Sequence, residues 1–189
     1  ITNNQGPVIS HQSSVISKLF IGTFHSFGAR MLRKEAAKFG RTPAFSIFDD
    51  DDSLSVFKKI VKAMKAEGMD PPSPALLLRR MYTTKNNLKD IEEERDLRAR
   101  AALIRQDKLL KEHDAFDVGD LIEKPVLLLQ RDREVRERYQ QATDYILVDE
   151  YQDVNPAQYE LVKLLAGKHR NLAVVGDDAQ AIYGWRDAN

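Results

Sequence analysis

Cysteine is absent from this sequence of 189 residues. Its absence excludes disulfide bonds, thiolate metal sites and cysteine nucleophiles within the chain. Long apolar runs are also missing, since no stretch approaches the ~18 residues of a membrane span. The first residues, Ile1 to Gly6, lack the basic start and the apolar stretch of a secretory signal. We therefore expect a cytoplasmic protein with no membrane partner, and a monomer by default.

A net charge of either sign is absent as well. Lys and Arg number 29, and Asp and Glu also number 29, so the formal net charge is zero. A nucleic-acid partner would therefore need a local basic patch. The four histidines, at positions 11, 25, 113 and 169, are too scattered for a metal motif.

The first part of the chain predicts one strand followed by several helices. The apolar stretch from Val15 to Thr23 predicts a short buried strand. A helix should follow it with Phe24 and Phe27 on its buried face, and Gly40 should end that helix. The acidic residues 49–52 favour the start of an amphipathic helix that ends at Gly68.

Further helices are predicted between residues 73 and 141. Ser73 and Pro74 suit the N-cap and first position of a helix. The charged stretch 90–111 indicates a solvated helix. The apolar stretch 118–130 is also helical in pattern, although Pro125 should kink or interrupt it.

The pattern then changes to that of an α/β fold. Residues 145–148 and 172–175 are continuous apolar runs, as expected for strands buried on both faces. Asn155 and Pro156 begin a helix between them. A strand, a helix and a strand at this spacing predict a βαβ unit with parallel strands.

Polar side chains follow both predicted strands at the edge where ligands bind in a parallel sheet. Asp149 and Glu150 come directly after the first strand, and the second leads into Gly176, Asp177 and, further on, Gln180. Carboxylates at such a position suit a hard cation such as Mg²⁺, which combines one or two carboxylates with phosphates and water. The apolar run 145–148 followed by Asp149 and Glu150 has the Walker B arrangement.

Four segments in this order closely resemble motifs of the UvrD/Rep helicases of superfamily 1. They are T-F-H-S-F from Thr23, F-D-V-G-D-L from Phe116, Y-I-L-V-D-E-Y-Q-D-V-N-P-A-Q from Tyr145 and V-V-G-D-D-A-Q-A-I-Y-G-W-R-D-A-N from Val174. The resemblance covers roughly residues 20–189. It implies an incomplete RecA-like motor domain, 1–46 and 113–189, interrupted by an all-helical subdomain at 47–112.

The resemblance also implies roles for individual residues. Asp149 would bind Mg²⁺, with Glu150 beside it as general base, and Gln152 and Asp153 would organise the same loop. Gln180 would sense the γ-phosphate of ATP. The residues expected to contact DNA are Thr23, His25, Tyr183, Trp185 and Arg186.

One motif of ATP-binding motors is missing from the chain. No G-x-x-x-x-G-K-[ST] stretch occurs, and neither Gly22 nor Gly28 is followed by a suitable Lys. Such a loop holds the β- and γ-phosphates. We therefore interpret the chain as an excised part of a helicase, and expect no ATP turnover by the chain alone.

The resemblance implies a parent enzyme that translocates on single-stranded DNA and unwinds duplex junctions, 3′ to 5′, in DNA repair or replication. Its cofactors would be ATP and Mg²⁺. Two alternatives stay open: a non-catalytic helicase-like module that binds DNA or a protein, and a part of a helicase–nuclease.

Overall fold

Two pairs of short parallel strands organise the computed structural model, which describes residues 19–177. Strand β1 (Ser46–Phe48) pairs with β2 (Ala115–Asp117), and β3 (Ile146–Val148) pairs with β4 (Leu172–Val174). Helices separate the two strands of each pair in the sequence, as parallel pairing requires. The predicted βαβ unit and the α/β fold class are thereby confirmed, with Ile146 opposite Leu172 and Val148 opposite Val174.

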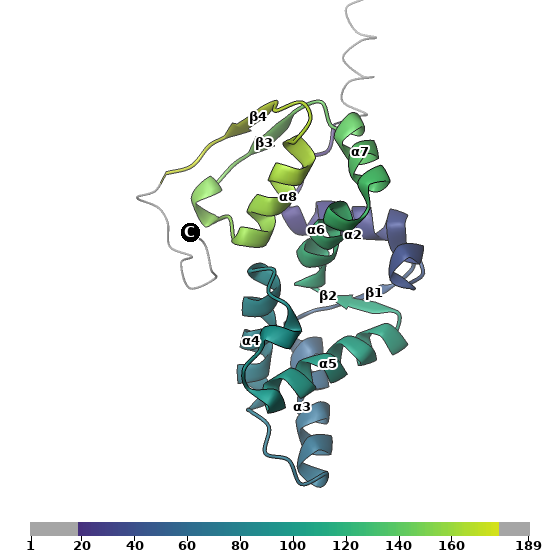
Figure 1. Ribbon diagram of the computed structural model, residues 1–189, viewed down its shortest axis with the longest axis vertical. Coiled ribbons are helices and arrows are strands. Elements are labelled where there is room, and N and C mark those ends of the chain that lie inside the picture. Colours follow the sequence, from purple (N-terminus) through teal and green to yellow (C-terminus); the bar gives the residue numbers. More distant parts are fainter. Residues whose placement is uncertain (1–18, 178–189) are drawn as a thin grey trace, which may run out of the picture.

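A helical lobe lies between β1 and β2 in the sequence and at the lower end of Figure 1. It consists of α3 (Asp50–Ala66), α4 (Pro74–Asn86) and α5 (Leu97–Glu112), with the 3₁₀ helix η2 (Ile91–Glu93) before α5. Asp49 and Asp52 form a capping box at the start of α3, and Ser73 caps α4 with Pro74 in its first turn. The assignment of 47–112 as a separate subdomain stays a prediction.

The lobe has an apolar core of its own. Its buried members are Val56, Phe57, Ile60, Val61, Met64, Leu77, Met81, Ala99, Ala102 and Leu103. The last three belong to α5, so the prediction of a solvated helix over 90–111 was wrong in two respects. Residues 90–96 are not α-helical, because Asp96 caps a helix that begins at Leu97, and small side chains then let α5 pack closely.

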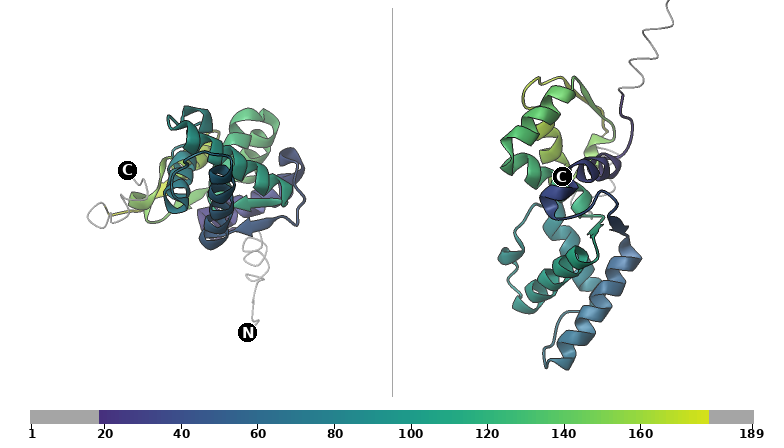
Figure 2. Two further views of the ribbon diagram at one scale, coloured as in Figure 1. Left: turned by 90° about the horizontal axis from the view of Figure 1, so that it is seen from below. Right: turned by 90° about the vertical axis from the view of Figure 1, so that its right-hand side faces the viewer.

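The other helices lie on one side of β3 and β4. They are α2 (Phe24–Glu35), continued by the 3₁₀ helix η1 (Ala36–Phe39), and α6 (Asp120–Arg131), α7 (Arg133–Ala142) and α8 (Pro156–Ala166). Their shared core contains Met31, Val126, Leu128, Leu129, Val135, Leu161 and Leu165. The three views show this upper group joined to the helical lobe at the level of β1 and β2 (Figures 1 and 2).

The helical pattern predicted over residues 118–130 is confirmed by α6, which runs through Pro125 without the interruption that was one of the two expected effects. Pro125 has no N–H to donate to the carbonyl of Leu121, one turn earlier. Gly28 of α2 packs at that carbonyl so closely that a Cβ on Gly28 would lie 1.7 Å from the Leu121 oxygen. The glycine therefore lets α2 approach α6 at the position where α6 has lost an internal hydrogen bond.

Two predictions about strands were wrong for the described residues; residues 15–18 of the first lie outside them. Residues 19–23 form no strand, and Ile21 is 85% exposed, because no described strand lies beside them to pair with. Strand β3 is covered on one face only: Val148 is buried on the side of α8, whereas Leu147 is 66% exposed. No element within residues 19–177 covers that second face. None of the helices in this part of the chain is long and apolar enough to cross a bilayer.

Candidate functional site

The carboxyl ends of β3 and β4 lie side by side and carry the predicted acidic residues. The amide of Val175 donates to the Val148 carbonyl at 2.8 Å, and the amide of Tyr151 donates to the Val175 carbonyl at 2.9 Å. The loop that starts with Asp149 and Glu150 therefore lies against the segment that leads to Gly176 and Asp177. The expected convergence of the two strand ends is confirmed for these residues.

Glu150 occupies an unusual backbone conformation in this loop. Its φ and ψ angles are 52° and 43°, in the left-handed region that side chains other than glycine rarely adopt. Such a conformation costs about 1–3 kcal/mol. The carboxylate of Asp149 accepts a hydrogen bond from the Glu150 amide at 3.0 Å, which helps to hold the turn. Both carboxylates are exposed at the sheet edge.

Gln152 connects the two halves of the site. Its Nε2 donates to Oε2 of Glu150 at 2.6 Å, while its Oε1 accepts from the backbone amide of Asp177 at 3.1 Å. Gly176 makes room for it, since a Cβ there would lie 2.6 Å from Oε1 of Gln152. The side chain of Gln152 thus fixes the Glu150 carboxylate relative to the end of β4.

Asp153 belongs to the same loop as Glu150. Its backbone amide donates to the Glu150 carbonyl at 3.0 Å, within the 3₁₀ helix η3 (Tyr151–Asp153). Its Oδ1 is shielded from solvent and accepts no hydrogen bond among residues 19–177. Unsatisfied buried oxygens are uncommon and are a frequent feature of functional sites.

Thr23 and His25 lie at the start of α2. Thr23 is the N-cap, and its Oγ1 accepts from the Ser26 amide at 3.1 Å. Phe24, between them, packs against the cluster of Val148, Val154 and Val162. The first turn of α2 is therefore tied to the strand that immediately precedes Asp149. Gln180, Tyr183, Trp185 and Arg186 lie outside the described residues.

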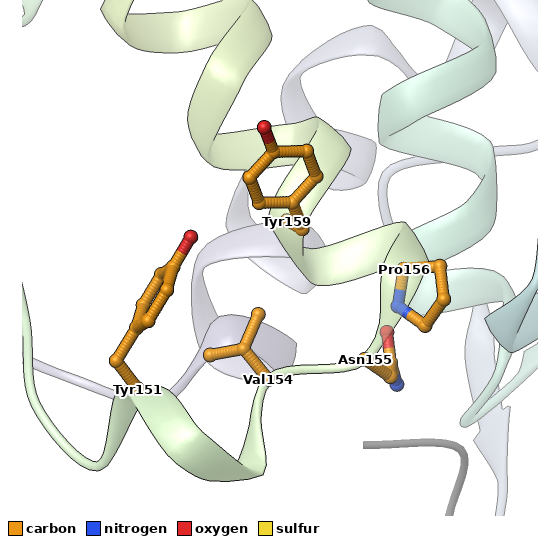
Figure 3. A pocket seen from close by; sticks show the side chains of 5 residues that line it. All are labelled: Tyr151, Val154, Asn155, Pro156 and Tyr159. Carbon is orange, nitrogen blue, oxygen red and sulfur yellow. The ribbon is translucent and has the colours of Figure 1, made fainter. Parts of the chain in front are cut away.

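A hollow of about 190 Å³ borders the acidic loop. Its walls are Tyr151 from η3 and Tyr159 from α8, and Val154 lies between the two rings (Figure 3). It is smaller than the roughly 300–1,000 Å³ of typical small-molecule pockets. The hollow alone therefore cannot enclose a nucleotide.

The structure also contains a buried ionic cluster that the sequence analysis missed. Lys85, at the end of α4, lies 2.5 Å from Oδ2 of Asp117 and 2.7 Å from Oδ1 of Asp120. Gln106 of α5 donates to the same Asp117 oxygen at 2.8 Å. The signal in the sequence was the pair of acids three residues apart where β2 ends and α6 begins, within the segment that resembles a helicase motif.

In this cluster the attraction between opposite charges outweighs the cost of burying them. Burial disfavours the charged form of Lys85, but the carboxylates of Asp117 and Asp120 outweigh it, so the pKa of Lys85 is raised. Burial likewise opposes ionisation of Asp120, yet Lys85 and Lys124 hold the pKa of Asp120 below its ordinary value. Lys85 and Asp120 are therefore both ionised around neutral pH.

Comparison with known proteins agrees with this arrangement of motifs. The sequence profile described as the UvrD/REP helicase N-terminal domain matches residues 2–189, nearly the whole chain. The chain belongs to the UvrD/REP helicase family. That membership confirms the resemblance inferred from the four motifs and accords with an incomplete RecA-like domain.

Members of the UvrD/REP family from several bacteria are similar in sequence. The ATP-dependent DNA helicase Rep of Escherichia coli K12 is 39% identical over 181 residues, which are 90% of this chain and 26% of that protein. The ATP-dependent DNA helicase PcrA of Staphylococcus epidermidis is 40% identical over 180 residues, 90% of this chain and 24% of that protein. The chain thus spans about a quarter of the length of these relatives.

Proposed function

We propose that the chain forms part of an ATP-dependent DNA helicase motor and supplies the carboxylate side of its Mg-ATP site. The observation that carries this proposal is the bridge from Glu150 through Gln152 to the amide of Asp177. It joins two family motifs at the carboxyl edge of a parallel strand pair, where ligands bind in such sheets.

The residues at this edge suit the chemistry of ATP hydrolysis. Asp149 is placed to hold hydrated Mg²⁺, a cation that prefers carboxylate oxygens combined with phosphates and water. Magnesium bound with ATP neutralises charge on the phosphate oxygens. Glu150 accepts the proton of the attacking water and can also contribute to the metal site. Gln152 and Asp153 keep this loop in place, and Gln180 detects the γ-phosphate.

The DNA strand is proposed to lie along residues from two segments. Thr23 and His25 contribute from the start of α2, and Tyr183, Trp185 and Arg186 from the segment after β4. Aromatic rings and a guanidinium plane suit binding that tolerates any sequence. The parent protein would translocate on single-stranded DNA and unwind duplex junctions 3′ to 5′ during repair or replication.

An ATPase assay on the full-length protein tests the proposal. We expect hydrolysis that single-stranded DNA stimulates, and a loss of about 10²-fold or more in Glu150→Gln, the range found when a general base is removed. Exposed Glu112 at the end of α5 provides the matched control, and Glu112→Gln should hydrolyse ATP normally. A wild-type protein that binds DNA without hydrolysing ATP would instead support the non-catalytic alternative.

The proposed role of Trp185 has a separate test. It is the only tryptophan of the chain, so its fluorescence reports on one site. Oligo-dT at low salt should quench this emission, and added salt should reverse the effect. Trp185→Ala in the full-length protein should hydrolyse ATP but unwind poorly. Emission that DNA does not alter, together with normal unwinding by Trp185→Ala, would remove Trp185 from the DNA site.

A further inference from the structure

The buried ionic cluster lies where the helical lobe joins the rest of the molecule. Lys85 and Gln106 come from the lobe, on α4 and α5, whereas Asp117 ends β2 and Asp120 begins α6. Their burial is nearly complete: the side chains of Lys85, Asp117 and Asp120 are 6%, 0% and 2% exposed. The proposed ATP and DNA contacts use none of these four residues.

Every oxygen of the two acids has a defined donor. Asp117 and Asp120 each accept the backbone amide of the other, at 2.9 and 3.1 Å, with one oxygen. Their remaining oxygens accept from Lys85, and Asp117 accepts from Gln106 as well. Buried ion pairs contribute little net stability, but in some proteins they restrict the groups that they join to one geometry. The cluster therefore restricts the angle at which the lobe can sit.

The end of α4 also reaches the core around β3 and β4. Leu88, three residues after Lys85, packs against the cluster that contains Met31 of α2, Leu129 of α6 and Leu161 of α8. Helix α2 begins within the T-F-H-S segment, and α6 begins with Asp120 of the ionic cluster. Helix α8 follows the acidic loop. The ionic cluster thus fixes the lobe on the helices that extend from both proposed sites.

We propose that Lys85 is a positioning residue: with Asp117 and Asp120 it holds the helical lobe at a fixed orientation on the motor core. Movement driven by ATP hydrolysis is then transmitted to the lobe as a rigid body. Loss of the cluster lets the lobe rotate, so that hydrolysis continues while less of it produces unwinding. This inference rests on the proposed helicase function.

The test uses the triple variant Lys85→Met/Asp117→Asn/Asp120→Asn in the full-length protein. It removes all three charges together, and each asparagine keeps an oxygen for the backbone amide that the aspartate accepts. No buried charge is left unpaired, so the fold should survive. The matched control is Arg105→Gln, which removes a paired charge inside the lobe, the Arg105–Glu67 bridge with contacts of 2.6 and 2.9 Å.

Two measurements decide the outcome. The first is the number of base pairs unwound per ATP, which should fall at least about fivefold in the triple variant, the lower end of ordinary coupling between sites. The KM for ATP should not change. The second is single-molecule energy transfer between dyes on cysteines introduced at Lys65 in the lobe and Arg133 on α7. Its distribution should broaden in the triple variant and stay narrow in Arg105→Gln.

A triple variant with wild-type unwinding per ATP and a narrow distribution would overturn the inference. Should the triple variant fail to fold, the same measurements on Lys85→Met/Asp117→Asn decide, because this double variant removes the 2.5 Å ion pair while Asp120 keeps Lys124 3.5 Å away. If neither the base pairs unwound per ATP nor the width of the distribution changed, the inference would again be overturned. A wild-type protein without DNA-stimulated hydrolysis would refute the proposed function instead, and the width of the distribution would still test the role of Lys85.

Discussion

The side-chain amide of Gln152 donates a hydrogen bond to the carboxylate of Glu150, with Nε2 and Oε2 2.6 Å apart. The same side chain accepts from the amide of Asp177, so the proposed general base is fixed to the end of the neighbouring strand. A general base must be held within hydrogen-bonding reach of the water that it activates.

Gln152→Ala should slow ATP hydrolysis more than it weakens ATP binding. The variant leaves the Glu150 carboxylate without its donor, and a hydrogen bond to a charged group is worth about 1.5–3 kcal/mol. We expect kcat for DNA-stimulated hydrolysis to fall about 10- to 100-fold, with a smaller change in KM. Gln141→Ala, at an exposed position near the end of α7, is the control. Equal losses in both variants would argue against the bridge.

Gly176→Ala should reproduce the effect of Gln152→Ala, although both side chains of the bridge keep their wild-type identity. The added methyl group would lie 2.6 Å from Oε1 of Gln152 and 3.2 Å from the amide nitrogen of Tyr151, so Gln152 must move. The double variant Gly176→Ala/Gln152→Ala should be no slower than Gly176→Ala alone, because the two changes break one interaction. Additive losses in kcat would show that Gly176 acts by another route.

Gly28→Ala should destabilise the protein. A Cβ at this position would lie 1.7 Å from the Leu121 oxygen, so α2 and α6 must separate. Overpacking of a core typically costs about 1–3 kcal/mol, and backbone rather than a flexible side chain is in the way here. Urea unfolding of the chain measures the loss. Gly167→Ala is the control, because its helical backbone tolerates alanine and its nearest contact, at 3.2 Å, is the end of the Gln140 side chain.

Lys85→Met alone should cost about 3–5 kcal/mol of unfolding free energy, since it leaves Asp117 buried without a cation and Asp120 with Lys124 only, 3.5 Å away. The pKa of Asp120 is lowered from 3.8, so its contribution is present above about pH 4 and is lost as the pH falls through its folded value. The pKa of Lys85 is raised from 10.5, so its contribution is present below that pH and is lost as the pH rises through its folded value.

The stability difference between wild type and Lys85→Met should therefore be flat from about pH 5 to pH 9 and shrink in acid. Urea unfolding across this range measures it. Lys38→Met, which removes an exposed partner of Asp132, should change the midpoint little at any pH. A difference in unfolding free energy between wild type and Lys85→Met that grows as the pH falls would contradict the assignment of charges in the cluster.

Hydrogen exchange should be slower in the helical lobe than in β3. The lobe contains a continuous apolar core built from α3, α4 and α5, with mostly local contacts. Strand β3 is short, and its Leu147 and the preceding Tyr145 are both more than 60% exposed. Amides of residues 56–64 and 77–81 should thus outlast those of residues 146–148. Faster exchange in the lobe would place the more stable unit around β3 and β4.

The sequence by itself determined the elements whose signals are local. The helix starts at Asp49, Ser73 and Asn155 and the helix end at Gly40 were readable because each depends on a few neighbouring residues. The parallel pairing of β3 and β4 followed from their spacing. The family was recognisable because four motifs occur in the expected order.

Only the tertiary structure decided the features that join distant residues. The burial of Lys85 depends on two acids more than thirty residues away, and no periodicity distinguishes it from an exposed lysine. Pro125 lies inside α6, where α2 brings Gly28 against the carbonyl that the proline leaves without an internal donor. Strand character at residues 19–23 needed a neighbouring strand that residues 19–177 do not provide. Apolar pattern is a property of a segment, whereas pairing, burial and charge compensation are properties of the surroundings that the fold supplies.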